Sequence, residues 1–183
     1  MPRLVRALSA ASVLALIAAG AARSEEHIYS YDAASPPARA LAETGLSFQF
    51  QRRPLGGTRL ERIIQTGETG FAEVRPASEG DLGAGGLKAA LGGQSPVGWL
   101  YEIKTDGDGQ AFVGAVCPGA DRAWLVVGPL RRFKDLPIQV VGKDAGAKSA
   151  RHCADLAFSF HSEWSLPPDR AAPKPLFADR RFR

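Results

Sequence analysis

Histidine and cysteine are scarce in this chain of 183 residues, which holds three His and two Cys. The histidines His27, His152 and His161 do not stand at the spacing of a compact pair of metal ligands. A zinc site that combined two of them with Cys117 and Cys153 would draw on widely separated segments. We therefore expect no metal ion and no cofactor, and we expect His27, near the start of the mature chain, to be mobile.

The chain has a single long uncharged run, from Ala7 to Ala22, which follows Arg3 and Arg6. A basic start, a short apolar run and small residues at its end are typical of a cleavable secretory signal. A membrane-spanning helix would need about 20 apolar residues. We predict a signal peptide over residues 1–22, a periplasmic or secreted protein, and no transmembrane segment in the mature chain.

Export would place the two cysteines in an oxidising compartment, where disulfides form. Cys117 and Cys153 are the only pair available, so the sequence predicts one disulfide between them. The alternative is two free thiols, one of them reactive.

The excess of basic over acidic residues lies at the two ends of the chain. The net charge is +4, and removal of Arg3 and Arg6 lowers it to +2. The segment 167–183 carries five basic and two acidic residues, which leaves the body near −1. A nearly neutral body lacks the basic face that phosphate contacts require, so nucleic acid is not an expected partner. We expect a disordered, proline-rich tail that is either solvated or in weak contact with an anionic surface.

Residues 23–166 are long enough for one domain with a real core. Apolar residues alternate at Leu46, Phe48 and Phe50, which predicts a half-buried strand. Further extended segments are expected at 58–66, 71–75, 97–104, 110–117, 121–128, 136–142 and 154–161. The pattern predicts a mainly β domain, an antiparallel sandwich or barrel with two or three short helices. A single α+β sheet with a helix on one face is the alternative.

Three short helices are suggested by local signals. Ser35 can cap a helix that starts at two prolines and ends near Gly45. Residues 85–93 and 143–152 also have helical character, although Gly146 weakens the second.

Asp106-Gly-Asp108-Gly could begin a calcium loop or turn a hairpin between 97–104 and 110–117. Gln110 and Ala111 stand where an EF-hand needs its third oxygen ligand and its glycine. Asp and Gly suit the positive φ of hairpin turns, so we predict a turn. The glycine-rich segment 80–93 lacks the G-K-[ST] ending of a phosphate loop.

No catalytic set is evident in the sequence. Asp155, Ser159 and His161 would share one face of a strand, but residues two apart lie about 6.5–7 Å from each other. That separation is too long for a nucleophile bonded to its base. Glu163, beside Trp164, could lie in a pocket.

Aromatic and basic residues also have alternative interpretations. Trp99, Tyr101, Trp124 and Trp164 could line a ligand site. Trp99 and Tyr101 share a strand face with Val97 and Ile103, however, a pattern more typical of a core than of a ligand site. The pairs 52–53 and 131–132 are expected at strand ends in solvent. The sequence thus predicts an exported, non-catalytic β domain that binds an envelope partner or small ligand or is structural. The alternative is an envelope hydrolase whose site assembles only in three dimensions.

Overall fold

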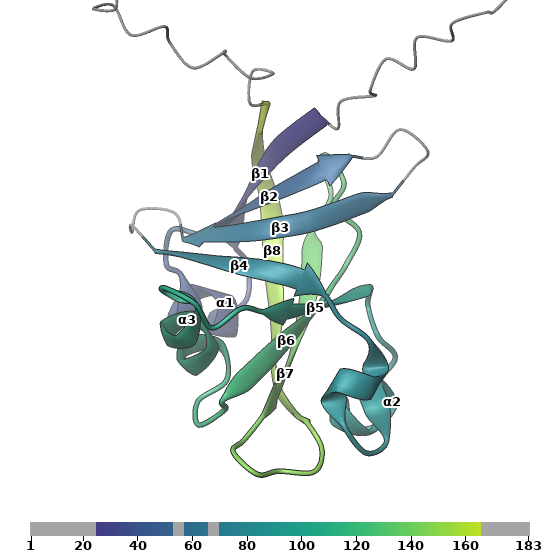
Figure 1. The fold of residues 1–183 in the computed structure, drawn as a ribbon. Coiled ribbons are helices and arrows are strands. Elements are labelled where there is room, and N and C mark those ends of the chain that lie inside the picture. Colours follow the sequence, from purple (N-terminus) through teal and green to yellow (C-terminus); the bar gives the residue numbers. More distant parts are fainter. Residues whose placement is uncertain (1–24, 53–56, 66–69, 166–183) are drawn as a thin grey trace, which may run out of the picture.

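The chain forms a closed antiparallel β-barrel in which each strand pairs with its neighbours in sequence order. The computed structural model describes residues 25–52, 57–65 and 70–165 (Figure 1). The eight strands are β1 (Glu25–Ala33), β2 (Leu46–Arg52), β3 (Thr58–Gln65), β4 (Phe71–Pro76), β5 (Trp99–Ile103), β6 (Arg122–Val127), β7 (Leu136–Lys143) and β8 (Arg151–Ser165). The prediction of a mainly β, barrel-like domain is confirmed. The predicted signal peptide and the tail 167–183 lie outside the described residues.

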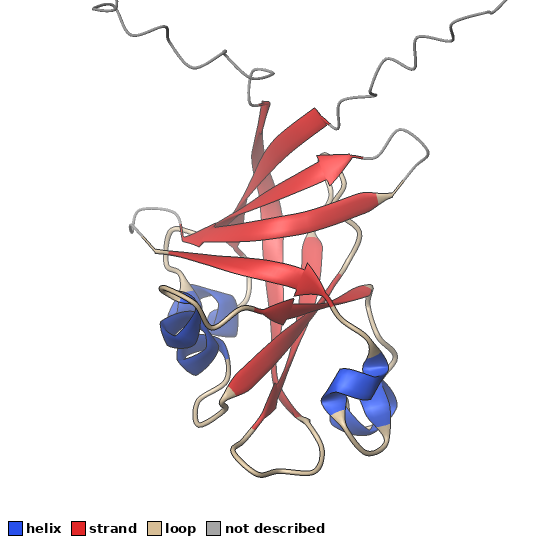
Figure 2. Ribbon diagram, in the orientation of Figure 1, coloured by secondary structure: helices blue, strands red, loops and turns tan. Residues whose placement is uncertain are grey.

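Three short helices and one 3-10 turn accompany the strands (Figure 2). They are α1 (Pro36–Leu41), α2 (Gly86–Ala90), α3 (Gly109–Val116) and the turn η1 (Glu79–Leu82). Their number agrees with the sequence-based expectation, and Ser35 caps α1 by accepting a hydrogen bond from the Ala38 amide.

Pairing of β1 with β8 closes the barrel. The register places Tyr29 opposite Glu163 and Tyr31 opposite Phe160, so His161 has no partner on β1 and forms a bulge. A second bulge, between β2 and β3, accommodates Glu61. Bulges of this kind increase the local twist and allow a sheet of eight strands to curl onto itself.

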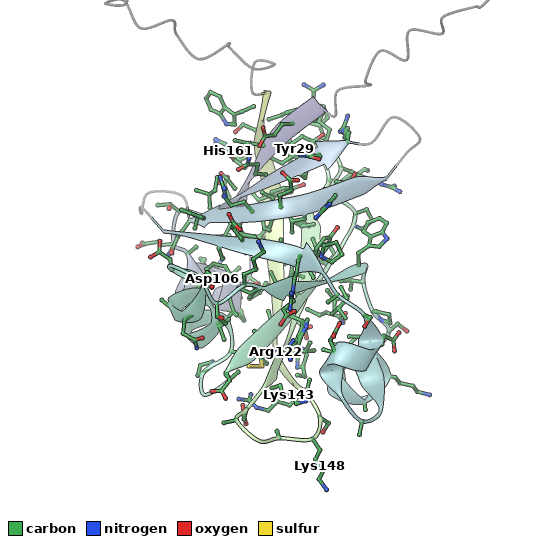
Figure 3. All side chains as sticks on the ribbon, in the orientation of Figure 1. Tyr29, Asp106, Arg122, Lys143, Lys148 and His161 are labelled. Carbon is green, nitrogen blue, oxygen red and sulfur yellow. A yellow bond between two sulfur atoms is a disulfide. The ribbon has the colours of Figure 1, made fainter. Side chains whose placement is uncertain are left out.

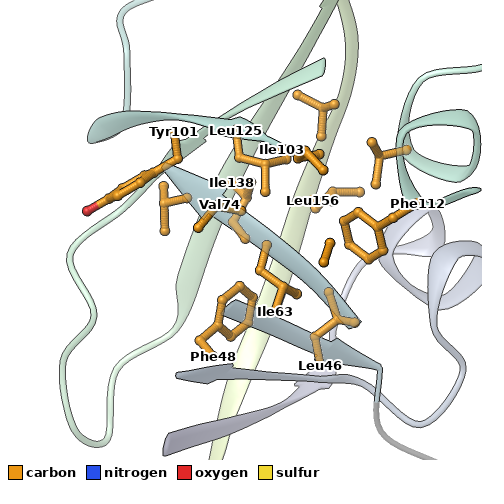
Figure 4. Close-up of a cluster of buried hydrophobic side chains, with 14 of the residues drawn as sticks. Leu46, Phe48, Ile63, Val74, Tyr101, Ile103, Phe112, Leu125, Ile138 and Leu156 are labelled. Carbon is orange, nitrogen blue, oxygen red and sulfur yellow. The ribbon is translucent and has the colours of Figure 1, made fainter. Parts of the chain in front are cut away.

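Large side chains fill the interior of the barrel. Phe48 and Phe50 of β2 and Tyr29 and Tyr31 of β1 are almost fully buried, and their rings meet edge to face. Leu125, Ile138 and Leu156 continue the same cluster from the other strands (Figure 4). A barrel of eight strands is just wide enough for side chains to fill it, and here they do.

The two ends of the barrel differ. We call the end at which β1, β3, β5 and β7 begin the rim, and the opposite end the helical end. At the helical end, α1 and α3 bury Ala38, Phe112, Val113 and Val116 against the barrel core. The turn η1 and α2 instead cover a separate outer cluster around Trp124 and Val141. The helices α1 and α3 thus cover the helical end, whereas η1 and α2, which belong to the β4–β5 connection of the rim, pack along the outer wall.

Three expectations about individual segments are wrong. Residues 110–117 form α3 and its C-cap rather than a strand, so the turn at Asp106 leads into a helix and does not join a hairpin. Residues 143–152 form the β7–β8 connection and the start of β8, not a helix. Strand β1 was not expected at all.

A disulfide joins Cys117, at the end of α3, to Cys153 on β8, with a Cα–Cα distance of 5.3 Å. Cys117 is fully buried, and Gly142 makes room for it, because a Cβ at Gly142 would lie 2.2 Å from the Cys117 Sγ. The bond fastens the helical cap to the closing strand of the barrel.

Replacing both cysteines with alanine is expected to lower the free energy of unfolding by about 3–4 kcal/mol, the value for a closed loop of this length. Urea unfolding of the oxidised protein and the double variant measures the difference. Reductant should shift the midpoint of the unaltered chain only. Equal midpoints for the two oxidised proteins would show that the bond does not stabilise the fold.

Candidate functional site

Three exposed aromatic side chains lie at the rim. Of the four large hydrophobic side chains that are exposed among the described residues, Trp99, Phe133 and Trp164 lie there, with exposed fractions of 57%, 75% and 63%. Trp99 begins β5, Phe133 lies in the β6–β7 loop and Trp164 is near the end of β8. The fourth, Phe71, begins β4 at the helical end.

Basic side chains outnumber acidic ones around these aromatic residues. The basic members of the rim are Arg52, Arg59, Arg131, Arg132 and Lys134, and the acidic members with described side chains are Glu26, Asp135 and Glu163. Arg52 is exposed at the end of β2, as the sequence predicts, whereas Arg131 and Arg132 are exposed in the β6–β7 loop and not at a strand end, and Arg53 lies outside the described residues. The rim therefore carries a net positive charge.

Phe133 is held in an unfavourable backbone conformation. Its φ is +57°, the only positive value at a non-glycine residue in the described part of the chain. Its ring meets that of Phe160 edge to face at a centroid distance of 5.3 Å, and the Arg132 guanidinium carbon lies 5.3 Å from the Phe133 centroid. A bulky residue rarely adopts this conformation, which costs about 1–2 kcal/mol.

A polar network fixes the β6–β7 loop to the barrel. The Glu163 carboxylate forms an ion pair with Arg132 at 2.6 Å and is bonded to His27 Nδ1 at 3.2 Å. Tyr29 bonds to Glu163 as well, and its hydroxyl accepts a hydrogen bond from Arg52. The Glu163 carboxylate of β8, which is 84% buried, thus binds residues from β1 and the β6–β7 loop, and Arg52 of β2 joins the network through Tyr29.

Burial is the main cause that raises the pKa of Tyr29, and the nearby Glu163 carboxylate adds to it, whereas Arg52 opposes it. The phenol is therefore protonated at neutral pH and serves as a donor to Glu163. Such a network offers hydrogen bonds and charge but no activated nucleophile, so its evident role is to hold the loop over the barrel end.

The network joins two residues that sequence reasoning treated separately. Glu163 does lie in a partly buried polar setting. The expectation that His27 is mobile is wrong, because His27 is 5% exposed on β1 and bonded to Glu163. The alternation of His27, Tyr29 and Tyr31 was the signal that could have revealed β1.

Other expected site residues stay on the outer surface. His161 bonds to Asp32 at 3.1 Å and His152 bonds to Asp155 at 3.1 Å, both in exposed pairs. Cys153 is taken by the disulfide, which leaves neither cysteine as a metal ligand. No group of three or more His, Cys, Asp or Glu side chains placed to hold a metal ion occurs within the described ranges.

The aromatic residues divide between core and surface. Tyr101 and Trp124 are buried, as a core interpretation requires, but Trp99 is exposed although its strand position faces inward. Trp99 is the first residue of β5 and lies where the barrel interior ends. Its side chain is therefore exposed although it is on the inward face of the strand. The core interpretation of Trp99 is therefore wrong.

A second polar cluster lies on the outer face, away from the rim. Glu102 is 8% exposed and accepts from Arg75 at 2.6 Å and from Arg122 at 2.5 Å. Arg122 also lies over the Trp124 ring, with 4.8 Å between its guanidinium carbon and the ring centroid. The two arginines satisfy the carboxylate, so this cluster ties β4, β5 and β6 together.

Tyr29 and Tyr31 offer a matched pair of substitutions. Tyr29→Phe removes a buried hydroxyl that bonds to Arg52 and Glu163, and it should lower the free energy of unfolding by about 2 kcal/mol. The Tyr31 hydroxyl is buried without a hydrogen-bond partner among the described residues. Tyr31→Phe should leave stability unchanged or raise it by about 1 kcal/mol. Urea unfolding measures both, and equal losses would contradict the network.

Within the described residues, no helix is both long enough and apolar enough to cross a membrane. Comparisons of the chain with protein-family models, with curated proteins and with solved structures each gave no match.

Proposed function

We propose that this protein is an exported, non-catalytic binding domain that docks on anionic phospholipid bilayers through its rim. The observation that carries the proposal is the position of Trp99, Phe133 and Trp164, three exposed aromatic side chains at the one barrel end that is also rich in arginine. Aromatic rings enter the bilayer interface, and basic residues near an anionic surface contribute about 1 kcal/mol each.

The β6–β7 loop is the central part of this docking surface. It places Arg131, Phe133 and Lys134, all exposed, next to one another. The positive φ of Phe133 and the Arg132–Glu163 ion pair hold its ring on the barrel end. Residues with strained backbone conformations are common at functional sites. Transfer of an exposed aromatic ring from water into a bilayer is favourable, because its apolar surface leaves the water.

The basic segment 167–183 supports the same interaction. It follows β8, whose final residues lie at the rim beside the start of β1. Its three net positive charges are therefore attached to the end of the barrel that carries the aromatic residues. The charges of the segment 167–183 and the side chains of the rim therefore support one interaction, and each can be removed by a separate variant.

The alternative of an envelope hydrolase has one observation in its favour, the junction of Glu163 with His27 and Tyr29 from another strand. The carboxylate of Glu163 is already bonded to Arg132, and the raised pKa of Tyr29 keeps that phenol protonated. These bonds favour a structural role for the network and hence the binding function.

Arg131→Gln with Lys134→Gln should weaken binding to vesicles of phosphatidylglycerol and phosphatidylcholine by about thirtyfold, at about 1 kcal/mol for each charge. Co-sedimentation of the mature chain measures the partition coefficient. The matched control is Lys143→Gln with Lys148→Gln, which removes two positive charges from the helical end, opposite Tyr29 in Figure 3. Neutral phosphatidylcholine vesicles and added salt should reduce binding of the unaltered chain. Equal partition of the two double variants would refute docking through the rim.

Phe133→Gly separates docking from stability. Glycine accepts a positive φ without strain, which offsets the lost contact with Phe160, so the free energy of unfolding should change by less than about 1 kcal/mol. Vesicle binding should fall by about tenfold, because the apolar ring no longer enters the interface. Phe71→Ala, which removes the exposed ring of the helical end, is the control and should bind as the unaltered chain does. Undiminished binding of the Phe133 variant would place the contact elsewhere.

A further inference from the structure

A hollow of about 310 Å³ lies where β3 separates from β4 and β5. It is open to solvent, and the exposed Trp99 indole and the exposed Arg59 side chain line it. Pro76 and Leu100 add apolar surface to its lining, together with the buried Tyr101. Its volume is within the usual range of ligand sites, and its lining combines apolar surface with a few polar groups, as such sites do.

The backbone of β3 presents an incomplete sheet edge to this hollow. β3 pairs with β2 from Thr58 to Gln65, but it pairs with β4 only from Arg62 to Ile64. The second half of β4, Val74–Pro76, pairs with β5 instead. Residues 58–61 therefore have a strand neighbour on one side only, and such an edge can accept an additional strand.

The Tyr101 side chain bonds to the backbone groups of β3 that an additional strand would otherwise pair with. The Tyr101 hydroxyl accepts a hydrogen bond from the Leu60 amide and donates one to the Thr58 carbonyl, both at 3.4 Å. Figure 4 shows the Tyr101 oxygen pointing away from the other labelled core side chains. These bonds are longer than the usual 2.7–3.2 Å of protein hydrogen bonds (about 2.9 Å at the mode), so a backbone partner with better geometry can displace them.

We infer that the β3 edge at Thr58–Glu61 binds an extended peptide segment of a partner protein, which adds as a strand beside β3. The Leu60 amide and the Thr58 carbonyl would bond to the peptide backbone, the mode known as β-strand addition. The Trp99 ring would pack on an apolar side chain of the peptide. Arg59, exposed on the outer face of β3, would attract an acidic residue. The site shares Trp99 and Arg59 with the rim, but it is tested separately from bilayer docking, because the docking variants lie in the β6–β7 loop.

The probe is obtained by selecting a displayed library of hexapeptides for binding to the mature chain. Each enriched peptide is then synthesised with and without N-methylation at alternate amides. Methylation removes backbone donors and leaves the side chains in place. We expect enriched peptides with a carboxylate and alternating apolar residues, and a Kd that rises about tenfold on methylation for the loss of one or two hydrogen bonds.

Three variants of the chain locate the site. Trp99→Ala should weaken peptide binding by about tenfold, and Trp164→Ala, which removes another exposed indole of the rim, should not change it. Tyr101→Phe should tighten binding, because the competing hydroxyl is gone. Amide exchange of Leu60 should slow when the peptide is bound.

The inference is overturned if no peptide is enriched, if methylated and unmethylated peptides bind equally, or if the Trp99 and Trp164 variants behave alike. Because Trp99 is more than half exposed, its substitution leaves the core intact, and circular dichroism of each variant verifies the fold.

Discussion

The pairing of β1 with β8 is the constraint on which the rest of this structure depends. It turns an open sheet into a barrel, and a barrel of eight strands has an interior only as wide as the side chains that fill it. The rings of Tyr29, Tyr31, Phe48 and Phe50 occupy that interior. A filled barrel cannot use its centre for a ligand, so interaction surfaces must develop at its ends and along its outer wall. The helical end is covered by α1 and α3, which leaves the rim.

The same closure builds the network that shapes the rim. Glu163 and His27 are neighbours only because β8 lies beside β1. The Glu163 carboxylate, which is bonded to His27, also forms an ion pair with Arg132 of the loop. A buried carboxylate needs several partners to offset its lost hydration, and here those partners come from β1 and the β6–β7 loop. The result is a loop whose aromatic tip is fixed on the barrel end, where an unattached loop of eight residues would move freely.

Local patterns of the sequence predicted much of the fold and little of the site. The alternation of Leu46, Phe48 and Phe50 identified β2, and Ser35 before two prolines identified α1, because each signal is contained in a few neighbouring residues. The run that became α3 is apolar almost throughout, and such a run does not distinguish a strand from a buried helix. Trp99 has the pattern of a core residue, but its exposure depends on where the barrel ends. The contact between His27 and Glu163 spans 136 residues, and no local pattern encodes it.

Closure by the first and last strands has a kinetic consequence. Every other pair of neighbouring strands is adjacent in the chain and can form as soon as both members exist, whereas β1 waits for β8. Until then both carry unpaired edges, which are the usual sites of intermolecular association. Contacts of such large sequence separation also slow folding, because the chain must lose much of its freedom before they form. The disulfide, which already fastens the start of β8 to α3, shortens this search by holding the last strand near the half-formed barrel.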